Sequence, residues 1–375
     1  MKVEQIYQLT NTIAKEVLGE DTVVQEDLSN IVDLGNEIQN TASMDKYVKS
    51  LIDHIGKVIF VDRPYKGSAP SVLMDSWEYG SILEKITMDA YPDATENESW
   101  ELEDGRSYDP NIFTQPHVSA KFFNNKSTFE IPMSFAERQV KSAFDSVSQL
   151  NSFFSMIESA IENSMTIRAD GLIMRCINNM IAQTLAGGNA NRVVHLLSTY
   201  NAQFGTSLTS DKAITDPEFV RWAVFHMGLY EARLRKLSTL FNEGGKERFT
   251  PTDKLHVVML DEFVQAANVY LQSDVYHNEM TKLPSAETVP YWQGSGTSYA
   301  FADTSSISVK HGATEVSEDY ILGVMFDRDA LGVSCLDRRV TSNYNPRGEF
   351  YNNWYKFDAG YFNDLNENFI VFLAD

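Results

Sequence analysis

The sequence VSQLNSFFSMIESAIENSMTIRADGLIMRCINNMIAQTLAGG, residues 147–188, carries the longest helical pattern in the chain. Its apolar residues recur at steps of three and four from Val147 to Ile181, and a pair of glycines closes the pattern. An unbroken helix would extend on the order of 55–60 Å at ~1.5 Å per residue. Asp170-Gly171 could kink it, because a glycine inside a helix costs about 1 kcal/mol relative to alanine. A helix of this length predicts a spine to which other elements attach.

A second distinctive stretch closes the chain: TSNYNPRGEFYNNWYKFDAGYFNDLNENFIVFLAD, residues 341–375. Aromatic residues and asparagines dominate it, and its last apolar run, Phe369 to Leu373, stops two residues before the C-terminus. Chain ends fray unless other elements hold them. We therefore expect this stretch to lie in a sheet or in an interface.

The composition indicates a globular and strongly acidic protein. The 375 residues are 43% hydrophobic, and 31 basic against 52 acidic residues give a formal net charge of −21. Affinity for phosphate backbones and anionic membranes comes from lysine and arginine, so this balance disfavours a protein that grips DNA or a membrane. The two cysteines, Cys176 and Cys335, lack metal-type spacing and fit a reducing compartment. With no pattern of a signal peptide or a membrane span, we expect a cytosolic chain, or one assembled in the cytosol.

An acidic and aromatic stretch lies early in the chain. From Asp75 to Asp109 there are eleven acidic and two basic residues, a net charge of −9. Strand-like segments flank the tip of this stretch: SILEKITM, at residues 81–88, precedes the tip, and VSAKFF and FEIPM follow it. Two strands around such a tip predict a long projecting hairpin, and long loops of this kind are usually functional or docked. The alternative is a solvated surface loop. The aromatic residues of interest are Trp77, Tyr79, Tyr91, Trp100 and Tyr108.

The second half of the chain predicts a compact α/β region within an α+β protein. Residues 215–218, Thr-Asp-Pro-Glu, begin a helix with a Thr or Asp cap and a proline in the first turn. We expect this helix to continue to the glycines at 244–245. The strand KLHVVML then runs directly into the helix DEFVQAANVYL, and ILGVMF predicts a further strand. This mixed order of elements is typical of the α+β class.

No constellation typical of an enzyme is found in the sequence. It has no phosphate-binding loop, no nucleophile elbow and no glycine pattern of a dinucleotide site. The seven histidines lack paired metal-ligand spacing, and residues 101–105 resemble a calcium loop only superficially. We therefore predict no catalytic, cofactor-binding or metal site.

The order of these elements resembles the major capsid proteins of tailed bacteriophages, whose fold is of the Hong Kong 97 type. The likeness is nearest to capsid proteins of short-tailed phages that infect Gram-positive hosts. Three stretches carry it: LIDHIGKV at residues 51–58, the start of the spine pattern within residues 135–161, and Asn-Pro-Arg-Gly at residues 345–348 with the strand that closes the chain. None of these motifs is catalytic, so the specificity lies in their order.

The resemblance implies a structural protein that self-assembles into the pentamers and hexamers of an icosahedral head around double-stranded DNA. It also implies a location in the virion after assembly in the host bacterial cytoplasm. The partners implied are further copies of the chain, a separate scaffolding protein, a portal protein at one vertex, and DNA enclosed without sequence-specific binding; no membrane is expected. The implied divisions are an N-terminal arm (1–61), an extended loop (62–132), a peripheral domain with the spine helix (133–210), an axial domain (211–335) and the closing β-sheet of the peripheral domain (336–375).

We expect the acidic stretch to dock on basic residues of an adjacent subunit. The alternative is that its acidic residues stay hydrated, since a surface ion pair contributes only about 0–1 kcal/mol. The interface candidates are Trp77, Tyr79, Tyr91, Trp100, Tyr108, Arg233, Arg235, Arg338, Arg339 and Arg347.

Three other functions remain open on the sequence alone. An encapsulin-type shell would share the fold but enclose an enzyme. A soluble hydrolase using acidic residues would be small and monodisperse, and an adaptor module would bind one partner without forming rings. Negative-stain microscopy of the purified chain distinguishes these outcomes.

Overall fold

The computed structural model describes residues 11, 70–74, 83–94, 96–97, 101–108, 111, 113–136, 147–272, 286–292, 305–311 and 314–375. The predicted N-terminal arm, apart from Asn11, lies outside this set, as do Trp77, Tyr79 and Trp100. The chain forms two compact units. Unit 1 comprises residues 1–79, 126–173 and 333–360, and unit 2 comprises residues 80–125, 174–332 and 361–375. The expected α+β class is confirmed.

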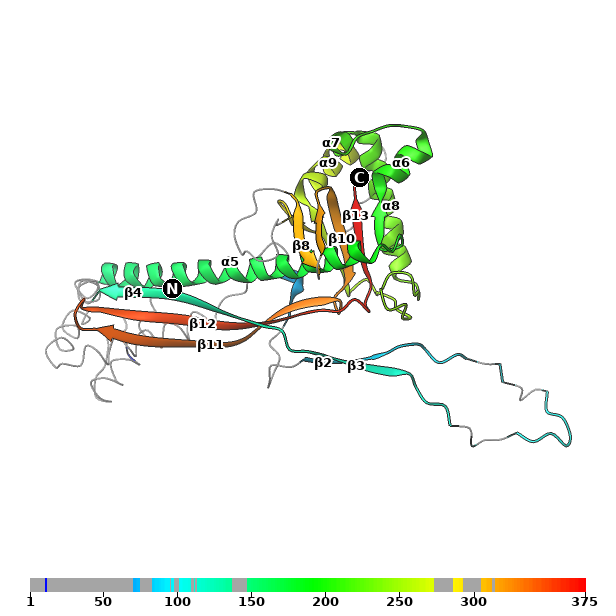
Figure 1. Cartoon of the computed structure of the whole chain (residues 1–375), viewed down its shortest axis with the longest axis horizontal. Coiled ribbons are helices and arrows are strands. Elements are labelled where there is room, and N and C mark those ends of the chain that lie inside the picture. Colours follow the sequence, from blue (N-terminus) through cyan, green and yellow to red (C-terminus); the bar gives the residue numbers. More distant parts are fainter. Residues whose placement is uncertain are drawn as a thin grey trace. The chain divides into compact units, whose positions relative to one another are not determined.

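Helix α5 (Val147–Gly187) is continuous over 41 residues, which confirms the predicted long helix. The helix runs through Asp170 and Gly171 without interruption (Figure 1). It ends where Gly188 adopts a left-handed conformation, φ 62°, that glycine reaches at little cost. The periodic apolar positions are buried as predicted, among them Leu172, Cys176, Ile177 and Ile181.

Unit 1 contains a four-stranded sheet in the order β1-β11-β12-β4. After a short 3-10 helix at Pro70–Val72, the strands are β1 (Leu73–Met74), β4 (Lys126–Ala136), β11 (Leu331–Asn345) and β12 (Phe350–Asn363). Figure 1 shows β4, β12 and β11 side by side. The predicted alternation in β4 is confirmed, since Phe129, Ile131 and Met133 share its less exposed face. Phe129 stacks on Phe357 of β12, with ring centroids 5.0 Å apart.

The Asn-Pro-Arg-Gly motif forms the turn between β11 and β12. The Asn345 side-chain oxygen accepts hydrogen bonds from the backbone N–H groups of Arg347 and Gly348, both at 3.1 Å. Asparagine commonly closes turns in this way, because its short side chain replaces a backbone acceptor. The motif is therefore structural, as expected.

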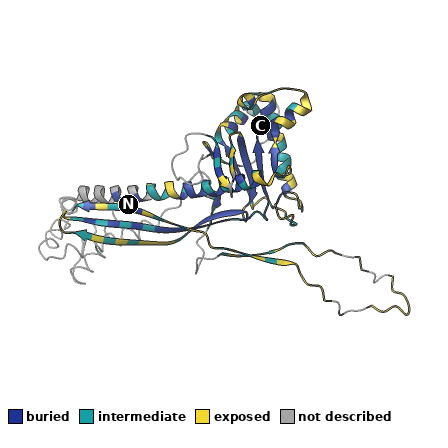
Figure 2. Cartoon of the chain, viewed as in Figure 1, coloured by how far each residue is buried: buried dark blue, intermediate teal, exposed yellow. Residues whose placement is uncertain are grey.

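Unit 2 contains a five-stranded sheet in the order β5-β13-β10-β6-β7. Its strands are β5 (Val193–His195), β6 (Leu255–Leu260), β7 (Glu287–Val289), β10 (Ile321–Asp327) and β13 (Phe369–Leu373). All of β10 and β13 is buried, and the sheet is dark blue in Figure 2. The closing strand thus lies in a sheet, as predicted, beside β10 and β5.

Four helices accompany this sheet: α6 (Leu196–Phe204), α7 (Ser210–Ala213), α8 (Pro217–Leu234) and α9 (Asp261–Gln272). Of the two predicted caps of α8, Asp216 is the one used, and its carboxylate accepts from the Phe219 N–H at 2.8 Å. The predicted end of α8 at the glycines 244–245 is wrong. The helix stops at Leu234 because its carbonyl accepts from the Thr250 N–H, and the returning chain pairs Ser238 with Arg248.

Two further hairpins complete the described residues. The first pairs β2 (Leu83–Met88) with β3 (Val118–Phe123), and the second pairs β8 (Ile307–His311) with β9 (Thr314–Glu318). The β2–β3 pairing confirms the hairpin predicted around the acidic stretch.

Candidate assembly surface on the β2–β3 hairpin

The β2–β3 hairpin is a regular antiparallel ladder. Its register runs from Leu83 opposite Phe123 to Met88 opposite Val118, and the Asp89 N–H continues it to the His117 carbonyl at 2.9 Å. Side chains alternate between the faces of a strand. The hairpin therefore has two faces of three residue pairs each.

One face, called here the outer face, is apolar and open. It consists of Glu84, Ile86, Met88, Val118, Ala120 and Phe122, and the burial pattern of both strands marks all six as exposed. The exposed fraction is 65% for Ile86, 66% for Phe122 and 50% for Val118. Figure 2 shows the alternation of exposed and less exposed residues along β2 and β3. Soluble proteins rarely leave such side chains together on a surface unless a partner covers them.

The opposite face, called the inner face, carries two lysines. They are bound to acidic residues in the C-terminal part of unit 2, which is called here the body together with the rest of that unit. Lys85 Nζ donates to Asp364 Oδ2 at 2.9 Å and to Glu367 Oε1 at 2.8 Å, and Lys121 Nζ donates to Asp364 Oδ1 at 2.7 Å. The side chains of Asp364 and Glu367 are only 2% and 8% exposed. We call these four residues the anchoring cluster, and all of them belong to unit 2.

Burial and charge act in opposite directions on the two acids. Burial by itself raises the pKa of Asp364, but the hydrogen bonds and charges of Lys121 and Lys85 outweigh it and leave the pKa below its ordinary value. For Glu367 burial prevails, and its pKa stays raised although Lys85 and Arg248 lower it in part. Asp364 is therefore the firmly ionised partner of both lysines.

The end of the hairpin is held a second time by residues 246–249. The Asp89 carboxylate is bound by Lys246 Nζ and by the Ser119 hydroxyl, the latter at 2.6 Å. Arg248 Nη1 donates to the Met88 carbonyl at 2.6 Å, and the Tyr91 N–H donates to Glu247 Oε2 at 2.7 Å. Hydrogen bonds and ion pairs thus fix the end of the β2–β3 ladder that is connected by the acidic segment.

Beyond the strands, the acidic segment exposes further aromatic and apolar side chains. Tyr91 is 46% and Tyr108 is 43% exposed, and Leu102 and Phe113 reach 67% and 85%. Tyr108 is engaged within the segment: its hydroxyl accepts from the Glu103 N–H at 3.2 Å, and the Arg106 guanidinium lies 5.5 Å from its ring centroid. The predicted aromatic candidates that the structure describes are therefore accessible.

The predicted basic candidates occur in two groups. Arg233 and Arg235 lie together at the end of α8 in unit 2, where Arg233 stacks over Tyr230 at 5.0 Å and Arg235 pairs with Glu231. Arg338, Arg339 and Arg347 lie in unit 1, on β11 and in the β11–β12 turn. Arg339 is already bound to Asp358, with Nη1 to Oδ2 at 2.8 Å. Arg233 and Arg235 share a helix end, and the other three share a hairpin.

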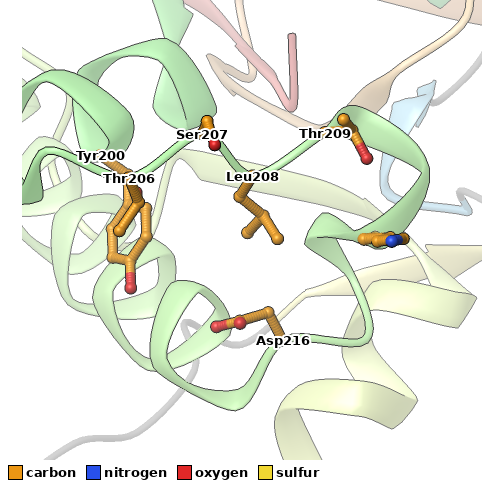
Figure 3. Close-up of a pocket in the computed structure, with 7 residues that line it drawn as sticks. Tyr200, Thr206, Ser207, Leu208, Thr209 and Asp216 are labelled. Carbon is orange, nitrogen blue, oxygen red and sulfur yellow. The ribbon is translucent and has the colours of Figure 1, made fainter.

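A pocket of about 340 Å³ lies between the end of α6 and the start of α8 (Figure 3). Its lining residues are Tyr200, Thr206, Ser207, Leu208, Thr209, Lys212 and Asp216. The polar groups serve the local fold, since Asp216 caps α8 and the Thr206 hydroxyl donates to Asn201 Oδ1 at 2.7 Å. The pocket does not include a residue that the sequence singled out for binding.

Sequence reasoning missed the anchoring cluster and the exposure of the outer face. The available signal was the alternation in VSAKFF, in which Val118, Ala120 and Phe122 share one face, as predicted. The ordinary interpretation of such a pattern places the apolar face inward. The partners that reverse it, Asp364 and Glu367, follow more than 240 residues later.

Two general properties follow from the described residues. No group of three or more His, Cys, Asp or Glu side chains among them is arranged to hold a metal ion. Within the same part of the chain, no helix is long and apolar enough to cross a membrane.

Comparison with known proteins identifies the family. Curated proteins gave no match. Among solved structures, the chain is similar to the capsid of Staphylococcus phage Andhra (9% identity, 80% of this chain and 82% of that chain, TM-score 0.49) and to the capsid of cyanophage P-SCSP1u (13%, 81% and 86%, 0.47). The mature capsid of bacteriophage PhiM1 is a third (8%, 83% and 86%, 0.43). The family model for the Phi29-like phage major capsid protein matches residues 10–373. The chain therefore belongs to the Phi29-like phage major capsid protein family, and it is a structural protein of a phage capsid.

Proposed function

We propose that the chain forms the pentamers and hexamers of an icosahedral head, and that the outer face of the hairpin packs on a neighbouring copy. The observation that carries this proposal is the reversed polarity of the hairpin. Lysines face the chain's own body, whereas Ile86 and Phe122 are 65% and 66% exposed. An isolated chain gains nothing from this arrangement, but a shell of identical copies can cover every such face.

The energy available is sufficient to drive specific contact. Full burial of an isoleucine or phenylalanine side chain contributes roughly 1.5–3 kcal/mol. Since about a third of each side chain is already covered, Ile86 and Phe122 retain on the order of 1–2 kcal/mol each. The same contact recurs for every subunit of a shell, so even this modest energy favours assembly strongly.

The acidic tip extends the same surface. It presents Tyr91 and Tyr108 among carboxylates, and aromatic residues are enriched where proteins meet. Arg233 and Arg235 are the receiving residues that we favour in the next copy, together with the exposed Arg338 and Arg347. Arg235 and Arg339 already have acidic partners, Glu231 and Asp358, which a carboxylate of the neighbouring copy would have to share or replace.

Family membership and charge support the remaining parts of the proposal. We propose the divisions at residues 1–61, 62–132, 133–210, 211–335 and 336–375 as arm, extended loop, peripheral domain, axial domain and closing sheet. Assembly takes place in the host bacterial cytoplasm with a separate scaffolding protein and a portal at one vertex. Each chain has a formal net charge of −21, and an acidic wall repels phosphates. The shell therefore encloses DNA without binding it tightly. No catalytic step is assigned to the chain.

The direct test replaces Ile86 and Phe122 by threonine, which keeps a strand-forming residue at each position. The variant is expected to keep the circular dichroism spectrum of the parent, because both side chains are exposed, while the yield of shells in negative-stain micrographs falls at least tenfold. Glu84→Thr, on the same face, is the matched control and should assemble normally. Shells formed by the double variant at the parental yield would refute the proposed docking face. Shells that contain protein cargo and exclude DNA would instead favour a compartment of the encapsulin type.

A further inference from the structure

We propose that Asp364 is a positioning residue that holds the β2–β3 hairpin with its outer face turned away from the body of the subunit. Its carboxylate binds Lys121 through Oδ1 and Lys85 through Oδ2, at 2.7 and 2.9 Å. The inference rests on the proposed function for its effect on assembly, but not for the position of the hairpin itself.

The two lysines of the inner face lie opposite one another. Lys85 and Lys121 are direct cross-strand partners in the β2–β3 ladder. Side chains at such positions start roughly 5 Å apart, and two like charges directly opposite one another destabilise the pair of strands. A hairpin with these two lysines on one face therefore needs an anion between them.

Asp364 supplies that anion. Its side chain is 2% exposed, so the carboxylate is fixed inside the body and each of its two oxygens faces one lysine. The burial that normally disfavours a charged carboxyl is outweighed by the two lysines, and the pKa of Asp364 lies below its ordinary value. One buried carboxylate thus converts a repulsive pair into a bridge.

Lys85 has more hydrogen-bond partners than Lys121. Lys85 Nζ also donates to Glu367 Oε1 and to the Asp329 carbonyl, both at 2.8 Å. Glu367 Oε2 lies 3.2 Å from Arg248 Nε. Lys121 is 42% exposed and has Asp364 as its partner among the ion pairs of the described residues. Removal of the Asp364 charge therefore takes from Lys121 its anionic partner opposite Lys85, which Glu367 still binds.

The consequence for the outer face follows from strand geometry. Successive side chains point to opposite faces, so fixing Lys85 inward turns Ile86 outward. The same holds for Lys121 and Phe122 on the partner strand. The carboxylate of Asp364 thereby determines which face of the hairpin is presented to a neighbouring copy.

The test is hydrogen exchange of the unassembled full-length chain, read by mass spectrometry over residues 83–88 and 118–123. Asp364→Asn is expected to speed exchange there at least tenfold, with β10 unchanged as the internal control for folding. Glu84→Thr, at an exposed position of β2 outside the anchoring cluster, is the control and should leave exchange within threefold of the parent. The double variant Asp364→Asn with Lys121→Thr removes the anion together with one of the two opposed lysines, so it should exchange at least threefold more slowly than Asp364→Asn.

Each outcome separates the interpretations. Unchanged exchange in Asp364→Asn would overturn the proposal, since other contacts would then suffice to hold the hairpin. A double variant that exchanges as fast as Asp364→Asn would also overturn it, because relief of the repulsion between the lysines would then have no effect. If Asp364→Asn alone does not fold, recovery of the parental far-UV circular dichroism spectrum in the double variant is the readout, and its absence overturns the proposal. If exchange behaves as expected but Asp364→Asn forms shells at the parental yield, the positioning role stands and the docking face is refuted.

Discussion

Replacing Ile177 by alanine tests the role of α5 as a spine most directly. Ile177 is 0% exposed and lies in the C-terminal third of the helix. The change removes three carbon atoms, and about 0.8 kcal/mol per buried methylene gives roughly 2–2.5 kcal/mol of lost transfer energy. The cavity left in a rigid helix interface adds to this, so we expect a total loss of about 3–4 kcal/mol. A loss of that size is a large share of the ~5–15 kcal/mol that holds an ordinary protein together.

The assay is urea denaturation of the unassembled chain, followed by far-UV circular dichroism. The midpoint should shift to lower urea while the slope stays unchanged, which indicates a loss of stability without a change in compactness. Ile167→Ala is the matched control, because it makes the same chemical change on the same helix at a residue that is 43% exposed. We expect the control to cost less than about 1 kcal/mol.

The comparison between the two variants tests whether α5 is packed through its buried face. Alanine lowers neither helix propensity nor solubility, so only burial distinguishes the two positions. Equal losses for Ile177→Ala and Ile167→Ala would mean that α5 is not packed as described and that the spine interpretation is wrong.

Three further predictions concern single groups. Asp216→Ala should lower the free energy of unfolding by about 1 kcal/mol, because the cap of α8 is lost, whereas Asp216→Asn keeps an acceptor and should be nearly neutral in thermal melts. Burial raises the pKa of the Cys176 thiol to about 12, so at pH 8 a disulfide reagent should modify Cys335 and spare Cys176 until the chain is denatured; equal native rates would contradict this. The hydrogen bond from Arg339 lowers the pKa of Asp358, so its stabilisation is present above the unfolded pKa and disappears as the pH falls through the folded one. Arg339→Met should therefore cost more stability at pH 7 than at pH 3, by a small margin because the arginine is partly exposed and solvent screens the pair, and an equal cost at both would count against the pair.

Elements with strong local signals were predictable from the sequence. The three- and four-residue spacing of α5, the direct strand-to-helix transition from β6 to α9, and the proline after Asp216 are properties of short windows. Each depends on neighbours within a few residues, where periodicity and capping chemistry decide the structure.

The end of α8 shows where local signals fail. Leu237 and Leu240 continue an apolar spacing after Leu234, which favoured a longer helix. Both leucines are half-exposed in the structure, and the chain turns to pair Ser238 with Arg248. Exposed apolar residues beyond the end of a helix carry the same local pattern as residues that face a core, so periodicity alone could not locate the end of the helix.

The sequence alone could not predict which strands pair with β13, for a related reason. The aromatic tail predicts strands, but β11 and β12 join the sheet of unit 1, while β13 pairs with β10 and β5 in unit 2. Which sheet a strand joins depends on segments far away along the chain. The continuous apolar run from Phe369 to Leu373, which is fully buried, is the local sign that β13 lies inside its sheet and not at an edge.

The polarity of the hairpin is decided by a competition whose terms can be compared. Turning β2 and β3 over would bury Ile86 and Phe122 and gain at most roughly 1.5–3 kcal/mol for each. It would also leave Asp364 buried without either lysine, at a cost of about 3–5 kcal/mol, and leave Glu367 with Arg248 as its remaining cation among the described ion pairs. These losses are of the same size as the gains, so the buried acids compete directly with the apolar content of the strands for the inward face. The apolar face remains outside, and its energy becomes available only when another copy of the chain covers it.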